Sequence, residues 1–272
     1  MRLPLREEVM TSNTKIFVKT ILTIVSCMLI LEVSAHDFLE SSQQIIMVIG
    51  SDWKASTGTL QRYERSRDGS WQKVGNQIDV SLGKNRMGWG QGLHDMPLKN
   101  DEPIIDREGL MRSPVGVFAV PSAFGKGDGA SWSVKLPYQE ISPTVFCSGD
   151  PQSKNYNRIV DTRHESQEDW SLGEDMQHYV DQGLYTYGAV IAHNYSPVVA
   201  GKSACFFIHV WRGSGKPTAG CTAMSANDAR EVISWLDPRR KPLLIQFPMI
   251  IYSKVQQLWK LPNLELDQLD EL

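Results

Sequence analysis

The residues with the clearest capacity for chemistry lie within the stretch 205–224, CFFIHVWRGSGKPTAGCTAM. His209 ends an apolar run, a loop rich in Gly, Pro and Ser follows, and Gly220 directly precedes Cys221. A thiolate is a nucleophile, a nearby imidazole can take its proton, and a preceding glycine lets backbone N–H groups approach a developing oxyanion. The spacing therefore indicates nucleophilic catalysis by Cys221 with His209 as its base, although a buried cysteine is also a common inert core residue.

The N-terminal segment indicates the compartment. Two lysines precede an apolar run at 20–31, and the small residues Val33-Ser34-Ala35 follow, as in a cleaved secretory signal. The run is shorter than the roughly 20 residues that cross a membrane as a helix. An uncleaved anchor and a lipoprotein that begins at Cys27 are the alternatives. We expect residues 1–35 to be a cleaved signal peptide, membrane contact only through this segment, and a periplasmic or cell-envelope location.

The cysteines are expected to divide into a disulfide and a free thiol. Disulfides persist in an oxidising compartment, and Cys27 would leave with the signal. We therefore expect Cys147 to pair with Cys205 and Cys221 to stay free. The bridge would stabilise the fold by roughly 4 kcal/mol in the chain-entropy model. A zinc site with Cys205, His209 and Cys221, and Cys147 as the fourth ligand, is the rival. Residues four apart in a strand, such as Cys205 and His209, are separated by roughly 13 Å, too far to share one ion.

Short strands are predicted to position these groups. The chain has 21 glycines and 14 prolines, many grouped in segments that suggest tight turns. Asp68-Gly69 predicts a hairpin turn, and runs of strand character lie at 45–49, 117–120, 134–136, 187–192, 204–211 and 242–247. Ser225 and Asp228 cap one clear helix, which stops at Asp237-Pro238, and a weaker helix lies near 168–182. We expect a mostly β fold with one or two helices.

Composition limits the domain organisation and the partners. Hydrophobic residues make up 41% of the chain, which argues against disorder. Lys and Arg number 28 against 31 Asp and Glu, without basic blocks, which argues against nucleic-acid binding. No repeat or linker interrupts residues 36–248, so we expect one domain there. Acidic residues predict that 249–272 is a solvated C-terminal tail.

Several segments, in the same order, resemble the YkuD-like L,D-transpeptidases of bacterial cell walls. The family pattern is an Ile-His pair at a strand end followed by Ser/Thr-x-Gly-Cys, here Ile208-His209 and Thr218-Ala219-Gly220-Cys221. Supporting segments are GWGQG at 88–92, SPVGVF at 113–118, AFG at 123–125, Asp150-Pro151, and the run from Tyr187-Gly188 to Asn194-Tyr195. The similarity extends over residues 45–248.

The resemblance implies a β-sandwich-like catalytic domain whose cysteine is acylated by a peptidoglycan tetrapeptide stem. It implies Cys221 as nucleophile, His209 as base and the Val210 carbonyl as the group that orients the imidazole. The N–H groups of Gly220 and Cys221 would form the oxyanion hole. The amine of another stem would resolve the thioester into a 3-to-3 cross-link, with no cofactor and no metal. Carbapenem-type inhibitors are candidate ligands of the same thiol.

Two positions depart from the family pattern. The usual His before Gly-Cys is Ala219, and the usual Arg two residues after the Cys is Ala223. Loss of the arginine removes a cation suited to the stem carboxylate, so Arg212 or Lys216 is expected to replace it. The predicted substrate-binding residues are Arg212, Trp211, Thr218 and His94.

The sequence leaves alternatives open. Water could resolve the thioester, which would make the protein an L,D-carboxypeptidase or hydrolase on the same stems. A non-catalytic wall-binding module is an alternative of a different class. The acidic pair Glu174-Asp175 could hold a substrate amine, although paired acids beside a helix are usually solvated.

Overall fold

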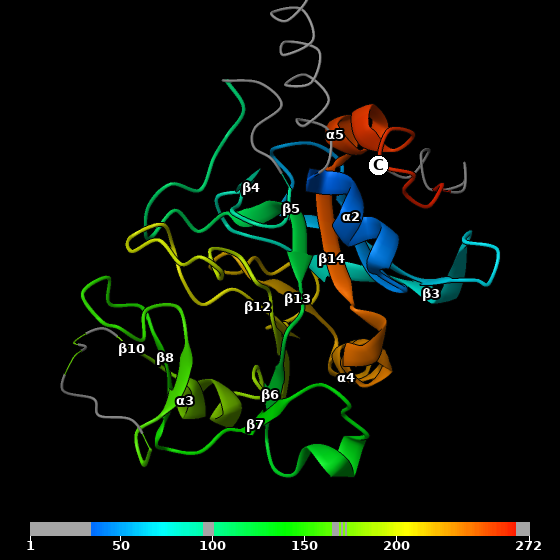
Figure 1. Ribbon diagram of the computed structural model, residues 1–272. Coiled ribbons are helices and arrows are strands. Elements are labelled where there is room, and N and C mark those ends of the chain that lie inside the picture. The colour runs from blue at the N-terminus through cyan, green and yellow to red at the C-terminus, as the bar shows by residue number, and fades with distance from the viewer. Residues whose placement is uncertain (1–33, 95–100, 165–168, 170, 172, 265–272) are drawn as a thin grey trace, which may run out of the picture.

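The computed structural model describes residues 34–94, 101–164, 169, 171 and 173–264 (Figure 1). Strands dominate this part of the chain, so the mostly β fold is confirmed, but it holds four α-helices instead of one or two. Residues 1–33 of the predicted signal peptide lie outside the described residues, as does the end of the predicted tail at 265–272. No helix in the described ranges is long and apolar enough to cross a membrane.

One half of the main sheet is built around β1 (Gln44–Gly50). All of its residues are buried, which fits an apolar strand covered on both faces. It pairs in parallel with β14 (Leu243–Pro248) and antiparallel with β2 (Thr57–Arg65). The predicted turn at Asp68-Gly69 joins β2 to β3 (Trp71–Ser81), which confirms the hairpin. With β5 (Ser113–Ala119) and β4 (Met87–Trp89), the order is β4-β5-β14-β1-β2-β3.

The other half of the sheet carries the Cys/His motif. Its strands, in spatial order, are β13 (Thr222–Met224), β12 (Phe207–Val210), β11 (Tyr187–Val190), β6 (Ala123–Gly125) and β7 (Tyr138–Glu140). The two halves meet where Ala223 pairs with Ser81. The clear predicted helix is confirmed as α4 (Ala226–Trp235), which packs against β11, β12 and β13. Its N-cap Ser225 accepts the Asp228 N–H at 3.2 Å.

A separate three-stranded sheet flanks the motif. Its order is β10 (Gly173–Asp175), β8 (Val145–Ser148) and β9 (Ile159–Asp161). The weaker predicted helix is present as α3 (Met176–Asp181), which begins directly after β10. In Figure 1 this sheet and α3 lie at the opposite end of the molecule from α2 (Ser34–Ser41).

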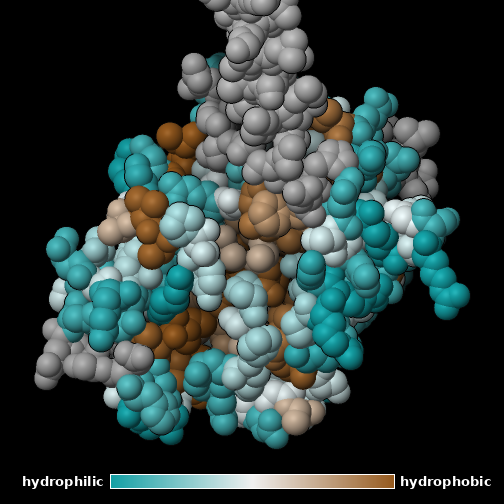
Figure 2. All heavy atoms as spheres, in the orientation of Figure 1, coloured by the Kyte–Doolittle hydropathy of each residue, from teal (hydrophilic) through white to brown (hydrophobic). Residues whose placement is uncertain are grey.

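Buried apolar side chains form two clusters. The large core joins β1, β2, β5 and β14 with α4 and the C-terminal helix α5 (Met249–Val255). The small core consists of Phe124, Ile141, Val145, Cys147, Met176, Val180, Leu184, Tyr185, Val190, Phe207 and Cys221. Figure 2 shows hydrophobic side chains recessed between hydrophilic ones along the middle of one face. The predicted nucleophile therefore belongs to the smaller of the two cores.

The expectation of a solvated tail is wrong for residues 249–264. Helix α5 contacts β14 and β1 and buries Ile251, Tyr252 and Val255. Leu261 is also buried, and the Tyr252 hydroxyl donates to the Pro262 carbonyl at 2.9 Å. Apolar residues at helical spacing, and not the charge of the segment, therefore determine that residues 249–264 pack against the sheet.

The strand expected at 134–136 is absent. A short 3-10 helix at Gly129–Trp132, capped by Asp128, ends at Ser133 in a left-handed conformation with φ +64°. The chain leaves this turn as a loop, and Leu136 is buried without strand pairing. The strand instead begins at β7, which pairs with β6.

Candidate active site

A cavity of about 360 Å³ opens between the small core and the loop that follows β12. Cys221 and His209 both lie in its wall. In the part of the chain that the structure describes, no hydrogen bond connects the two side chains. The parallel pairing of β12 with β13 brings them together, because Ile208 pairs with Thr222, the residue after Cys221. Other lining residues include Glu174, Tyr179, Tyr185, Trp211, Arg212 and Thr218.

Gly220 and Cys221 form a tight turn that leads into β13. Gly220 has φ +137°, and a Cβ there would lie 2.6 Å from Phe206 Cε1 and 2.9 Å from the Arg112 carbonyl oxygen. Glycine is therefore required both by the backbone conformation and by the close approach. The Thr218 hydroxyl donates to the Cys221 carbonyl at 2.6 Å and fixes the turn from the loop side.

The N–H group of Gly220 is already engaged. It donates to Thr218 Oγ1 at 3.0 Å, so the oxyanion role expected for it would require this bond to break. Thr218 thus positions the turn as well as lining the cavity. Ser113, the first residue of the SPVGVF segment, donates to the Gly220 carbonyl at 2.9 Å and accepts the Gly83 N–H at 2.8 Å. It holds the turn from the side of β5.

Backbone groups of the neighbouring strand surround the Cys221 thiol. The Phe207 N–H donates to Sγ at 3.4 Å, and Sγ lies 3.8 Å from the Cys205 carbonyl oxygen. Burial first, and then the Glu174 carboxylate, raise the pKa of the thiol to about 12. The uncharged thiol is therefore the stable form at neutral pH.

The imidazole of His209 is fixed by the backbone of the next residue. Its Nδ1 lies 2.7 Å from the Val210 carbonyl oxygen, as the predicted orienting role requires. Because a carbonyl only accepts, Nδ1 carries the proton and Nε2 keeps its lone pair. The Tyr185 ring packs against the imidazole, with centroids 5.2 Å apart. Burial lowers the pKa of His209 to about 4, so the ring is neutral, the state that a general base needs.

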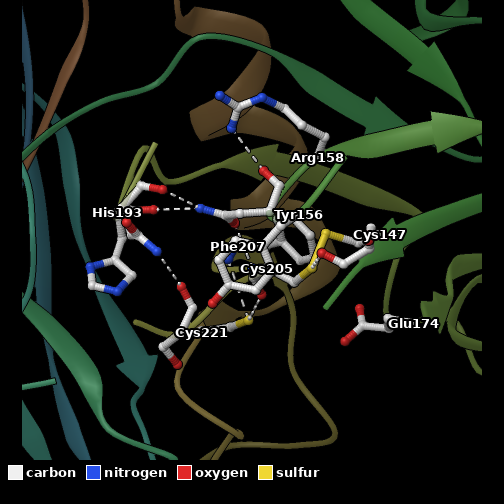
Figure 3. The surroundings of a disulfide bond; sticks show 12 residues. Cys147, Tyr156, Arg158, Glu174, His193, Cys205, Phe207 and Cys221 are labelled. Atoms are coloured by element: carbon white, nitrogen blue, oxygen red, sulfur yellow. Dashed lines mark hydrogen bonds between the residues drawn. A yellow bond between two sulfur atoms is a disulfide. The ribbon is translucent and has the colours of Figure 1, made fainter. Parts of the chain in front are cut away.

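Cys147 and Cys205 form a disulfide, and Cys221 is the free cysteine of the described residues. The bridge joins β8 to the segment before β12, next to the thiol (Figure 3). Cys205 has φ +62°, and its N–H donates to Asn157 Oδ1 at 2.9 Å. A covalent bond and a hydrogen bond therefore fix the backbone whose carbonyl faces the nucleophile.

Three of the four predicted binding residues line the cavity, namely Trp211, Arg212 and Thr218. Arg212 is exposed and donates to Gln182 Oε1 at 2.7 Å. Lys216, the other cation expected near the stem carboxylate, lies in the same wall. The two positions that depart from the family pattern have different surroundings. Ala219 lines the cavity, whereas Ala223 is fully buried and pairs with His209 and Ser81 across the sheet.

The structure does not bring His94 to this cavity, so the prediction that it contacts substrate there is wrong. Its Nδ1 accepts the Val117 N–H at 3.0 Å, and its ring packs against Trp89 and Phe118. The imidazole is buried and serves as an acceptor for the backbone of β5. A histidine after a glycine-rich turn carries no sequence signal that separates this structural role from a catalytic one.

Glu174, which the sequence offered only as half of an acidic pair that is usually solvated, and Tyr185, which no motif pointed to, both line the cavity. The Tyr185 hydroxyl donates to Glu174 Oε1, and burial raises the pKa of this carboxyl to about 7. They come from separate segments of the chain, β10 and the loop before β11, so no sequence spacing links them. Within the described ranges, no group of three or more His, Cys, Asp or Glu side chains is arranged to hold a metal ion.

Comparison with known families agrees with this geometry. A sequence model of the L,D-transpeptidase catalytic domain, YkuD, matches residues 51–245. Searches of curated proteins and of solved structures found no match. The matched span covers more than half of the chain and holds the Cys/His motif, the cavity and the disulfide. The chain therefore belongs to the family of YkuD-type L,D-transpeptidase catalytic domains.

Proposed function

We propose that the protein is a cysteine L,D-transpeptidase that acts on peptidoglycan tetrapeptide stems and forms 3-to-3 cross-links in the periplasm or cell envelope. The observation that carries the proposal is the free Cys221 thiol in the same cavity wall as the neutral imidazole of His209. Membership of the L,D-transpeptidase family supports the substrate class. Arg212 and Lys216, which line the cavity, are proposed to bind a stem carboxylate.

Acylation forms the first half of the proposed reaction. Cys221 Sγ attacks the carbonyl carbon that joins the third stem residue to the terminal D-alanine. As the C–S bond forms, the thiol proton passes to His209 Nε2, and it then moves to the departing D-alanine nitrogen as the C–N bond breaks. Burial disfavours a preformed thiolate and imidazolium pair, so the proton is expected to move during the attack.

Transfer to an acceptor forms the second half. The amine of another stem attacks the thioester carbonyl, an amide bond forms, and the C–S bond breaks. The departing thiolate regains a proton through His209. Water as the attacking group would give tripeptide and make the protein a hydrolase on the same stems.

The proposed acyl-enzyme is tested by intact-mass spectrometry after incubation with a tetrapeptide stem and, separately, with a carbapenem. We expect an adduct on Cys221 that is absent in Cys221→Ala and forms about 100-fold more slowly in His209→Ala. Its rate should be constant near pH 7 and fall as the pH approaches 4, because protonation of His209 removes the base. A folded, reduced protein that forms no adduct would contradict the proposal and favour the wall-binding module.

Product analysis on purified muropeptides tests the transfer step. Dimers with 3-to-3 links are expected. Tripeptide and free D-alanine without dimers would instead identify the hydrolase.

A further inference from the structure

Glu174 occupies a distinct place in the cavity wall. It lies at the centre of β10 and pairs with Cys147, the residue of β8 that carries the disulfide. The neighbouring Asp175 is exposed and caps α3 by accepting the His178 N–H at 3.1 Å, so the two acids have different surroundings. Figure 3 shows the Glu174 side chain directed from its strand towards the side that holds Cys205 and Cys221.

One tyrosine connects this carboxylate to the base of the proposed reaction. The Tyr185 hydroxyl donates to Glu174 Oε1, and the Tyr185 ring packs against the His209 imidazole. Tyr185 is buried in the small core and also contacts Phe207, whose N–H faces the nucleophile. Glu174 is thus held in a fixed position relative to both Cys221 and His209.

The charges around Glu174 leave its carboxylate without a counterion. No Lys or Arg forms an ion pair with it in the part of the chain that the structure describes. The ionisable groups that interact with it are Tyr179 on α3, Tyr185 and Cys221. The other charged or titratable groups of the cavity are Glu108, His209, Arg212 and Lys216. A desolvated carboxylate without a cation is energetically costly, so a positively charged group of a ligand would stabilise it.

We propose that Glu174 binds the primary ammonium group of the acceptor and takes its proton before the nitrogen attacks the thioester. The inference rests on the proposed function and names a residue for its second half. An ammonium nitrogen has no lone pair, so it cannot attack until one proton leaves. That proton moves to a Glu174 carboxylate oxygen and the N–C bond forms. The second proton returns through His209 to the departing Cys221 sulfur as the C–S bond breaks, and Glu174 then releases its proton to solvent.

This assignment gives the cavity a preference for an amine over water. Water carries no charge, so it gains nothing from an unpaired carboxylate beyond an ordinary hydrogen bond, whereas an ammonium gains a charge-assisted one. Burial raises the pKa of Glu174 to about 7, so this carboxylate can accept a proton from the amine at neutral pH.

The test separates the two half-reactions in Glu174→Gln. Release of D-alanine from a donor stem, measured under single-turnover conditions with enzyme in excess, reports acylation. Dimer formation after the isolated acyl-enzyme is mixed with an acceptor stem reports transfer. We expect acylation no slower than about half the parental rate, because loss of the carboxylate can only lower the pKa of the Cys221 thiol. Transfer should be slower by about 100-fold, with a shift of products from dimer to tripeptide. Asp181→Asn, which removes an exposed carboxylate from the end of α3, is the matched control and should transfer like the parent.

The pH profile supplies a second readout. Transfer by the parent should rise through about pH 7, as Glu174 ionises, and then level off. In Glu174→Gln it should instead keep rising towards the pKa of the free amine, roughly 10.4 for a lysine-type group. Tyr185→Phe should show a smaller loss of transfer, because it removes the hydroxyl that holds the carboxylate and leaves the carboxylate itself.

Three results would overturn the inference. Transfer by Glu174→Gln at the parental rate would show that the carboxylate takes no part, and an equal fall of acylation and transfer would assign it a structural role. A parent that releases no D-alanine would remove the proposed function, and the role of Glu174 with it. Since acylation is measured separately in every variant, these failures are distinguishable.

Discussion

The two cores of this protein are stabilised in different ways. In the large core, β1 is buried along its whole length and contributes Ile45, Ile46, Met47, Val48 and Ile49 to a continuous apolar cluster. The small core mixes apolar side chains with Cys221, a disulfide and Tyr185, and it borders the cavity that holds His209 and Glu174. Apolar burial dominates the first, and covalent and polar contacts supplement it in the second.

The difference has a physical reason. A nucleophile, a base and a carboxylate must be partly desolvated for their protonation states to differ from those in water, yet each needs a polar partner inside the protein. The Val210 carbonyl, the Phe207 N–H and the Tyr185 hydroxyl supply these partners. A region with so many polar groups gains less from apolar burial, and the disulfide compensates by constraining the unfolded chain.

Removal of the disulfide should have the largest effect on stability. The two cysteines are 58 residues apart, so Cys147→Ser/Cys205→Ser should lose about 4 kcal/mol of unfolding free energy in the chain-entropy model. Chemical denaturation measures this loss. Hydrogen exchange should show that amides of β8 and β9 lose more protection than those of β1 and β14.

Cys221→Ala is the control for that experiment, because it removes a sulfur from the small core without opening the bridge. Its unfolding free energy should fall by less than that of the double variant. Equal loss of protection in β1 and β8 would contradict the comparison and make the molecule a single cooperative unit.

A truncation in the large core should affect stability and leave the chemistry intact. Ile46 is fully buried, so Ile46→Ala should lower the unfolding free energy by about 3 kcal/mol through lost burial and the cavity left behind. The rate of Cys221 acylation per folded molecule should stay within about twofold of the parent. A large fall in that rate under conditions where the variant is folded would show that the two cores are coupled.

The sequence predicted those parts of the site that depend on local order along the chain. Cys221 and His209 come from one stretch, in which a strand, a loop and a capped helix follow in that order, and the parallel pair β12 and β13 brings His209 beside the start of β13, directly after Cys221. The disulfide could be predicted because a signal-like N-terminal segment and an odd cysteine left few pairings. The mostly β fold followed from the many turn signals and the β-branched runs.

Features that depend on packing between distant segments could not be predicted in this way. Glu174 and Ser113 reach the site from elements far from the motif, and their roles come from contacts with Tyr185 and Gly220. His94 was misjudged because its partner, the Val117 N–H, lies on β5, well beyond the loop that carries His94. The acidic residues near the C-terminus gave no indication that α5 packs on the large core.

The smallest effect is expected from Arg212, which lies at the rim of the cavity and belongs to neither core. Its guanidinium is exposed and held by Gln182, so Arg212→Gln should leave the unfolding free energy unchanged. If it binds a stem carboxylate, KM for the donor stem should rise about tenfold while kcat stays constant, because the interaction is the same in the ground state and the transition state. Arg230→Gln, on the exposed face of α4, is the matched control for charge. A fall in kcat with KM unchanged would instead place Arg212 in contact with the reacting centre, and the chemistry would then extend beyond the small core to its rim.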